Sequence, residues 1–352
     1  MDNAGEGRIS WGGYIEFSHE SDALERSTGS PLNPLAYRIN SHLCSLLWIR
    51  KLSITFPLRI FNPRLEISPS ITTESNALVC APLSFLSSNL CKMVRILITG
   101  STDGFGLEAA RQLVQRKHTV YLHARSQERA DEVKAKLPGA AGVLVADLTS
   151  VAETRKLAEE ANAIGVFDSV ILNAGLLYGP FRKTPDTGVP AMVFVNVIAP
   201  YILACLLKQP KRLTFIASVL HREAANTNVK DIFWLERGEK DFKDFPAYCD
   251  SKLHVMLLAN AVARRFNGTS VTSVHPGWVA TKLGGQGATD KLEDGVETYV
   301  MLAEGDYDQS LTGVYFEPKR KIGEPLAVTA DEDLQEVVVK ACEDITSLKL
   351  AA

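Results

Sequence analysis

From residue 93 to the C-terminus, short apolar runs alternate with longer amphipathic stretches. Six runs have the length and composition of buried strands: residues 94–99, 119–124, 142–146, 169–173, 212–218 and 269–276. Between them lie segments with a helical spacing of apolar residues, such as 107–117 and 154–165. Strands that alternate with helices form right-handed βαβ units, which build a parallel sheet with helices on both faces. The sequence therefore predicts a doubly wound α/β domain.

The chain changes character at Met93. Residues 27–92 are rich in Ser, Thr, Leu and Pro and show no sustained strand or helix period. We expect residues 1–92 to be a poorly ordered N-terminal extension. Two explanations stay open, an artefact of the assigned gene start and a regulatory or sorting segment, because such a composition does not separate them. Residues 93–352 are expected to form one catalytic domain that begins at Met93.

Charge and cysteine content exclude several classes of partner. A net charge of -3 gives no reason to expect nucleic acid or an anionic membrane. No apolar run is both long enough and sufficiently free of charge to span a bilayer. The six cysteines lie far apart, without a CxxC pair or a Cys/His cluster, so neither a zinc site nor a disulfide framework is indicated. We expect no metal and a cytoplasmic location, where thiols stay reduced.

The first predicted strand runs directly into a glycine-rich turn, TGSTDGFG, residues 99–106. Glycine lets the backbone turn tightly and approach a pyrophosphate, and the following helix directs free N–H groups at the anion. An ordinary strand-to-helix turn also contains glycine, so the residues at the later strand ends are needed to distinguish a dinucleotide site from such a turn. On the dinucleotide interpretation the cofactor contacts are Gly100, Ser101, Thr102, Gly104, Phe105 and Gly106.

The GxxxGxG spacing after a threonine resembles that of the short-chain dehydrogenase/reductase family, and the resemblance extends over residues 93–352. It implies a Rossmann-type fold and a nicotinamide cofactor. Where NAD-selective members carry a carboxylate after the second strand, this chain has Arg125, with Arg129 one turn further on. A guanidinium suits a 2′-phosphate and cannot accept a hydrogen bond from a ribose hydroxyl. The predicted cofactor is therefore NADP(H).

The resemblance also assigns cofactor contacts to the later strand ends. After the third strand it places the adenine edge, after the fourth the NAG motif, and after the sixth the residues that border the nicotinamide. Thr281 would bind the carboxamide or the phosphates. In chain order these residues are Asp147, Leu148, Asn173, Ala174, Gly175, Pro276, Gly277, Val279 and Thr281.

A tyrosine and a lysine four residues apart, Tyr248 and Lys252, share one face of a predicted helix. A phenol has an ordinary pKa of ~10, and a nearby ammonium lowers it. Such a phenol can protonate a carbonyl oxygen as hydride reaches the carbon. The resemblance adds that Lys252 holds the nicotinamide ribose, that Ser218 hydrogen-bonds the substrate carbonyl and the tyrosine, and that Asn196 completes a proton relay.

The chain departs from the commonest members between Ser218 and Tyr248, which are 30 residues apart, about twice the usual spacing. The insert, residues 221–247, resembles the branch that contains retinol dehydrogenases, WW-domain oxidoreductases and ketoreductase-like proteins. We expect it to shape the mouth of the substrate site.

The resemblance implies an NADP(H)-dependent oxidoreductase acting on lipophilic ketones, aldehydes or secondary alcohols. One alternative is an NADP-binding regulatory protein without significant turnover, although none of the four catalytic residues is missing. Another is an epimerase or dehydratase of the extended branch, although position 103 is Asp where that branch has glycine. A monomer and a homodimer both remain open.

Overall fold

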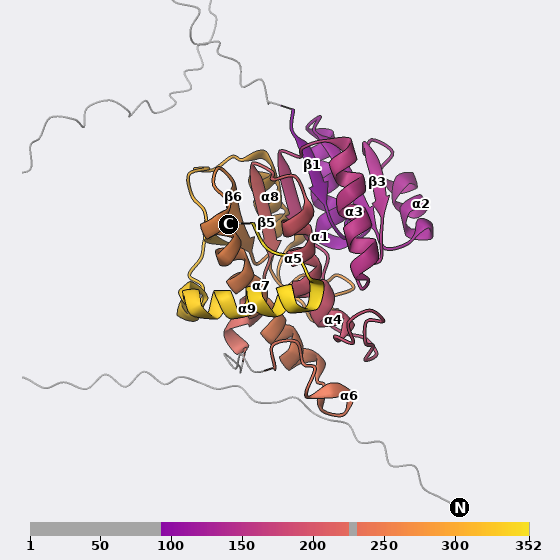
Figure 1. Cartoon of the computed structure of the whole chain (residues 1–352). Coiled ribbons are helices and arrows are strands. Elements are labelled where there is room, and N and C mark those ends of the chain that lie inside the picture. The colour runs from indigo at the N-terminus through magenta and orange to yellow at the C-terminus, as the bar shows by residue number, and fades with distance from the viewer. Residues whose placement is uncertain (1–92, 225–230, 352) are drawn as a thin grey trace, which may run out of the picture. The chain divides into compact units, whose positions relative to one another are not determined.

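The computed structural model describes residues 93–224 and 231–351, and the predicted extension, residues 1–92, lies outside them. In this part of the chain an eight-stranded sheet has helices on both faces (Figure 1). The strand order is β3-β2-β1-β4-β5-β6-β7-β8, and only the β7–β8 pair is antiparallel. The strands are β1 (Arg95–Ile98), β2 (Thr119–Ala124), β3 (Gly142–Val145), β4 (Ser169–Leu172), β5 (Arg212–Ile216), β6 (Ser270–Val274), β7 (Val314–Glu317) and β8 (Lys321–Ile322). The predicted doubly wound α/β fold is confirmed.

Alternate residues of the central strands supply two hydrophobic cores, one on each face of the sheet. In β1, Leu97 joins the cluster on one face, whereas Ile96 and Ile98 join the cluster on the other. β4 divides in the same way, with Val170 and Ile171 on opposite faces. Strands buried on both faces are rich in apolar residues, which is why these runs could be predicted from the sequence.

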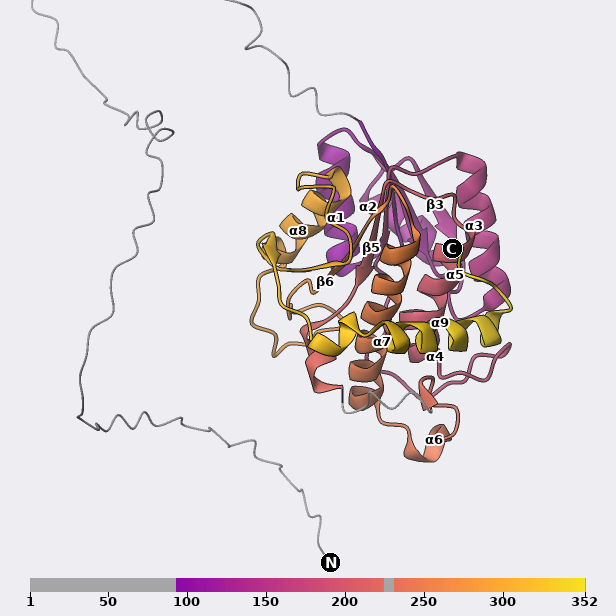
Figure 2. The ribbon, with the colours of Figure 1, turned by 60° about the vertical axis from the view of Figure 1, so that its left-hand side comes forward.

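The helices divide between the two faces (Figure 2). Apolar residues of α1, α2 and α8 belong to the cluster on one face, and those of α3, α5, α7 and α9 to the cluster on the other. The helices are α1 (Gly104–Gln115), α2 (Gln127–Lys136), α3 (Val151–Ile164), α4 (Ala191–Val193), α5 (Ala199–Leu206), α6 (Gly238–Asp241), α7 (Asp244–Arg265), α8 (Leu292–Glu304) and α9 (Glu332–Thr346). Within the described residues, no helix is both long and apolar enough to cross a bilayer.

The chain order reverses direction across the sheet at β1, which pairs with β2 on one side and β4 on the other. In open parallel sheets such a switch point leaves a crevice at the C-terminal ends of the strands, where ligands bind. The glycine-rich turn follows β1 and the NAG motif follows β4, so both lie at this crevice.

Three local features of the structure were not predicted. β7 and β8 were not predicted, because the apolar run of β7 stops before Glu317 and β8 has only two residues, so neither carries enough periodic signal. The long helix begins at Asp244, so Tyr248 lies in its second turn and not at its start. Pro246 lies within the first turn, where proline is tolerated because the N–H has no helical partner. Finally, Asn196 lies in a π-helical segment, Phe194–Ile198, and not in a regular helix.

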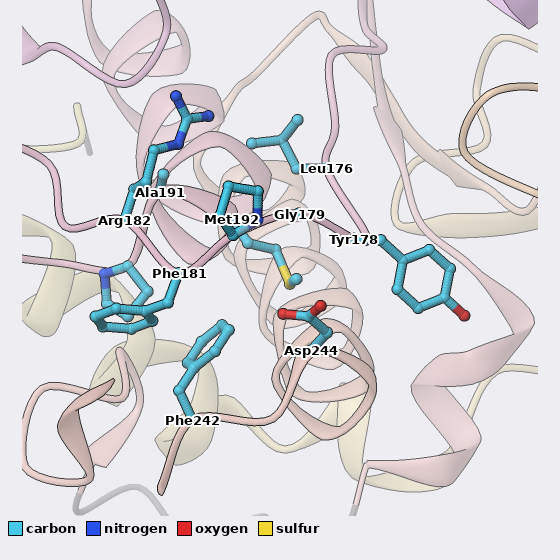
Figure 3. A pocket seen from close by; sticks show the side chains of 11 residues that line it. Leu176, Tyr178, Gly179, Phe181, Arg182, Ala191, Met192, Phe242 and Asp244 are labelled. Carbon is cyan, nitrogen blue, oxygen red and sulfur yellow. The ribbon is translucent and has the colours of Figure 1, made fainter. Parts of the chain in front are cut away.

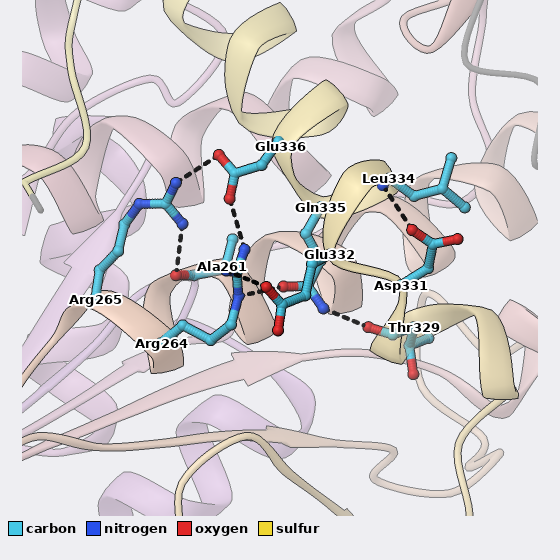
Figure 4. Close-up of polar contacts among 9 residues, drawn as sticks. All are labelled: Ala261, Arg264, Arg265, Thr329, Asp331, Glu332, Leu334, Gln335 and Glu336. Atoms are coloured by element: carbon cyan, nitrogen blue, oxygen red, sulfur yellow. Dashed lines mark hydrogen bonds and ion pairs between the residues drawn. The ribbon is translucent and has the colours of Figure 1, made fainter.

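The C-terminal helix α9 lies across α7 and α5 (Figures 1 and 2). Ion pairs at the end of α7 fix it: the Arg264 guanidinium is 2.9 Å from a Glu332 oxygen and 2.5 Å from a Glu336 oxygen (Figure 4). On α5, the Tyr201 hydroxyl donates to the carbonyl oxygen of Leu348 at 2.9 Å. The helix that carries Tyr248 is therefore held from both sides, by the sheet and by α9.

Candidate active site

The glycine-rich turn after β1 fits closely against the end of β4. Gly100 has φ +60°, and a Cβ there would lie 2.8 Å from the Ala174 Cα. A Cβ on Gly106 would lie 2.5 Å from the Asn173 amide nitrogen. Neither position can hold a side chain, and a smooth backbone surface of this kind is what a pyrophosphate needs beside a helix N-terminus. The structure thus brings the predicted glycine turn and the NAG motif together.

Asn173 ties the two strand ends to one another. Its amide nitrogen donates to the carbonyl oxygens of Thr99 (2.8 Å) and Gly100 (3.0 Å). Its amide oxygen accepts a hydrogen bond from the Tyr299 hydroxyl on α8 at 3.0 Å. The Ala174 N–H donates to the Thr99 hydroxyl at 3.0 Å. Asn173 is therefore a structural clamp on the turn, and Tyr299 is a supporting residue that sequence reasoning missed.

His123, near the end of β2, is a second residue that sequence reasoning missed. Its Nδ1 accepts the Gly100 N–H at 2.9 Å, and its Nε2 lies 3.0 Å from the Ala146 carbonyl oxygen. Because a carbonyl can only accept, Nε2 carries the proton and the ring is neutral. The side chain is 2% exposed, and burial lowers the pKa of His123 to about 4. A neutral histidine thus holds the glycine turn in place.

Buried histidines predict a loss of stability in weak acid. Burial lowers the pKa values of His123, His254 and His275 to about 4, below the ordinary value of 6.5. The unfolded chain therefore takes up protons that the folded chain rejects. Stability from these groups is complete above pH ~6.5 and falls by about 1.4 kcal/mol per pH unit for each histidine below it. Urea unfolding between pH ~6.5 and ~5 measures this slope.

A free energy of unfolding that stays constant between pH ~6.5 and ~5 would contradict this prediction. A His254→Gln variant provides the internal check, because it removes one of these proton-binding groups and should reduce the slope.

Two arginines lie beside the turn at the end of β2. The Arg129 guanidinium donates to the Thr102 hydroxyl at 3.0 Å and to Glu132 at 2.7 Å. Arg125 follows the last residue of β2 and is exposed. Among residues 93–224 and 231–351, no hydrogen bond or ion pair engages the Arg125 guanidinium. The structure therefore places both predicted arginines at the crevice, with Arg125 the less engaged of the two.

At the end of β3, the predicted adenine-edge residues have local contacts. Asp147 Oδ1 accepts hydrogen bonds from the Thr149 N–H (3.0 Å) and hydroxyl (2.9 Å). The Leu148 side chain is buried in the core cluster that includes α3. Both residues follow β3, the strand next to β2, on the same side of the switch point as Arg125.

Tyr248, Lys252 and Ser218 are buried together where β5 meets α7. The Lys252 ammonium lies 5.4 Å from the centre of the Tyr248 ring and donates to the Ile216 carbonyl oxygen at 2.8 Å. Lys252 is 4% exposed, and burial lowers its pKa to about 8. Burial raises the pKa of Tyr248 to about 12, and the neighbouring Ser218 side chain acts in the opposite direction. The three predicted groups thus lie together in one buried cluster that is shielded from water.

Asn196 acts on the backbone next to this cluster. Its side-chain amide accepts the Leu176 N–H at 2.8 Å and donates to the Leu176 carbonyl oxygen at 2.9 Å. It also donates to the Ser251 hydroxyl at 3.0 Å. A Cβ on Gly175 would lie 3.4 Å from the Asn196 amide oxygen and 3.7 Å from the Lys252 ammonium. Asn196 therefore fixes the loop that passes over Lys252.

The loop after β6 lies against the glycine turn. A Cβ on Gly104 would be 3.4 Å from the Thr281 methyl group. The Thr281 hydroxyl accepts the Gly284 N–H at 3.1 Å, and the ammonium of Lys282 is 2.7 Å from an oxygen of Asp103. The predicted residues Pro276, Gly277, Val279 and Thr281 all belong to this loop, which follows β6 on the side of β1 opposite β2.

A shallow pocket lies beside the cluster, with about 370 Å³ of space that is partly open to solvent (Figure 3). Most of its lining is apolar or aromatic. The insert contributes Phe242, whereas residues 225–230 of the insert lie outside the described part of the chain. The lining residues are Leu176, Tyr178, Gly179, Pro180, Phe181, Arg182, Pro190, Ala191, Met192, Phe242 and Asp244.

The residues present fit a nicotinamide dinucleotide. The glycine turn leads into the N-terminus of α1, where a pyrophosphate would bind, and the Lys252 ammonium lies beside Gly175 of the NAG motif. Within the described residues, no group of His, Cys, Asp or Glu side chains could hold a metal ion. Fold and site together define the class of dinucleotide-binding α/β proteins.

Comparison with known proteins specifies the family. The family model described as short chain dehydrogenase matches residues 94–211. The chain is 84% identical over 260 residues to short-chain dehydrogenase chyC of Penicillium rubens, covering 74% of this chain and 100% of that protein. It is 75% identical over 258 residues to short-chain dehydrogenase chry4 of Gibberella zeae, covering 73% and 99%. The chain belongs to the short-chain dehydrogenase/reductase family, and it is an oxidoreductase of that family.

More distant relatives agree with the predicted branch. Human retinol dehydrogenase 11 is 33% identical over 206 residues, which is 53% of this chain and 62% of that protein. Among solved structures, a protein from Mycobacterium paratuberculosis has a TM-score of 0.61 at 21% identity, covering 74% of this chain and 95% of that one. At this identity, the structural match supports the fold alone.

Proposed function

We propose that this protein transfers a hydride between NADP(H) and a lipophilic ketone, aldehyde or secondary alcohol, with Tyr248 as the general acid and base. The observation that carries the proposal is the burial of Tyr248, Ser218 and Lys252 in one cluster beside the glycine turn. A pocket lined mostly by apolar and aromatic residue types lies next to the cluster, with Leu176 of its lining bonded to Asn196. The match to a protein named retinol dehydrogenase supports a lipophilic substrate.

The chain's own groups supply the proton. In the direction of reduction, a Tyr248 pKa of about 12 keeps the phenol protonated at neutral pH. The phenol donates to the substrate oxygen, and Ser218 donates a second hydrogen bond to the same oxygen. The phenolate that forms is stabilised by the Lys252 ammonium, which lies 5.4 Å from the ring centre. The bound cofactor supplies or accepts the hydride, and the protein supplies orientation and the proton.

NADP(H) is the proposed cofactor because the end of β2 presents cations and no carboxylate at the crevice. Arg129 already contacts the turn through Thr102, and Arg125 is exposed without a partner in the described residues. Guanidinium groups bind a phosphate with two parallel hydrogen bonds. Of the two arginines, Arg125 is therefore the principal candidate for the 2′-phosphate.

We also propose that residues 93–352 are the catalytic domain and that the protein works in the cytoplasm. The alignment that covers 100% of a relative is 260 residues long, the length of the proposed domain. The three cysteines in the described residues, Cys205, Cys249 and Cys342, are free thiols, which supports a reducing compartment.

A panel of apolar ketones, aldehydes and alcohols tests the activity directly. We expect aryl and alkyl ketones to be reduced with NADPH at rates at least about tenfold above those with NADH at equal concentration. The measurement is the loss of nicotinamide absorbance in the presence of the full-length protein. NADPH binding without turnover of any panel member would instead favour a regulatory protein.

A further inference from the structure

The pocket contains one acidic group on the same helix face as the catalytic tyrosine. Asp244 and Tyr248 are four residues apart on α7, so their side chains lie one turn apart on one face, with Cβ atoms about 5–6 Å from each other. Asp244 lines the pocket together with Leu176, Met192 and Phe242. A compound whose carbonyl lies at Tyr248 and whose body fills the pocket must pass this carboxylate.

Three contacts of residues in the pocket wall or next to it connect the pocket with the catalytic cluster. Leu176, in the pocket wall, is held by both its N–H and its carbonyl through Asn196. Gly175, the preceding residue, lies over the Lys252 ammonium. On another side of the pocket, Tyr178 is close enough to Tyr248 to raise the pKa of that phenol.

The Asp244 carboxylate has no partner in residues 93–224 and 231–351, neither a hydrogen-bond donor nor a cation. In Figure 3 it points toward Met192, whereas the 64% exposed phenol ring of Tyr178 points away from the other lining side chains. The other charged group of the lining, Arg182, lies at the far side of the view, with its guanidinium turned away from Asp244. A carboxylate among apolar and aromatic groups accepts hydrogen bonds and offers none.

We propose that the substrate carries an N–H donor, an amine or amide nitrogen, which hydrogen-bonds to Asp244 while the reacting carbonyl lies at Tyr248. The inference rests on the proposed function and narrows its substrate class. It follows that the substrate is an apolar compound that carries a nitrogen donor rather than a pure hydrocarbon ketone. A bound compound without the donor would remove water from the carboxylate and leave it without a hydrogen-bond partner. That cost falls only on compounds that lack the donor, so the site should discriminate strongly against them.

A pair of probes of equal shape tests the proposal: para-aminobenzylacetone, which has N–H donors, and para-methylbenzylacetone, which has none. With the full-length protein and NADPH, we expect the amino probe to have a kcat/KM about tenfold higher, mainly through a lower KM. In Asp244→Leu the preference should fall to about one or reverse. Asp244→Glu, which restores an acceptor, should recover part of it.

Asp241→Leu is the matched control, because Asp241 is an exposed carboxylate three residues away that does not line the pocket. It should retain the tenfold preference. Equal kcat/KM values for the two probes in the wild-type protein, or an unchanged preference in Asp244→Leu, would overturn the inference while leaving the proposed function intact. Failure of the wild-type protein to reduce either probe or any ketone would overturn both. Thermal melting of each variant separates loss of preference from loss of fold.

Discussion

Replacing Tyr248 by Phe is expected to lower kcat for carbonyl reduction by about a thousandfold, with the Kd for NADPH within about twofold of wild type. The change removes one oxygen atom and keeps the buried ring, so packing against Lys252 is retained. What is lost is the proton donor, and a positioned general acid is worth about 100- to 10,000-fold in rate. NADPH oxidation measures kcat, and the quenching of protein fluorescence measures cofactor binding.

Tyr201→Phe is the matched control for this experiment. Tyr201 is also a buried phenol, but its hydroxyl donates to the Leu348 carbonyl oxygen in the C-terminal segment and touches no group of the catalytic cluster. Its removal should cost some stability and leave kcat near the wild-type value. If Tyr248→Phe kept more than about a tenth of the wild-type kcat, the assignment of Tyr248 as the acid would be wrong.

The sequence predicted the strands best where both faces of a strand are buried. The first six strands could be predicted because a central parallel strand is buried on both faces and is therefore rich in apolar residues, as in β4, where Val170, Ile171 and Leu172 follow Ser169. β7 and β8 escaped prediction because short runs near the edge of the sheet have no distinctive pattern. The start of α7 escaped it too, since Asp244 and Pro246 look like loop residues until the helix that follows is known.

The candidate site divides in a similar way. Tyr248 and Lys252, and the glycines at 100 and 106, could be proposed because their chemistry requires a fixed spacing along the chain. The residues that hold them could not, because His123 and Tyr299 reach the turn from β2 and α8 through contacts that only the fold creates. Asn196 could be proposed as a site residue. Its two hydrogen bonds with the Leu176 backbone could not, because they depend on how the segments that carry these residues come together in the fold.

Replacing Arg125 by Asp is expected to weaken NADPH binding by about a hundredfold and to change the Kd for NADH by less than about threefold. Hydrogen bonds between charged groups contribute about 1.5–3 kcal/mol, and here the new carboxylate would also repel the 2′-phosphate. NADH lacks that phosphate, and a carboxylate at the end of β2 can accept its ribose hydroxyls. Fluorescence titration with each cofactor measures the two Kd values.

The variant changes the charge of the protein by two units, so a general electrostatic effect has to be separated from a local one. Lys134→Asp makes the same change on an exposed residue of the adjacent helix α2. Because exposed charges more than a Debye length of about 8 Å apart are largely screened at physiological salt, it should weaken NADPH binding only slightly. Equal losses for NADPH and NADH in Arg125→Asp would show that Arg125 does not face the 2′-phosphate. The selectivity would then have to come from Arg129, which already contacts the glycine turn through Thr102.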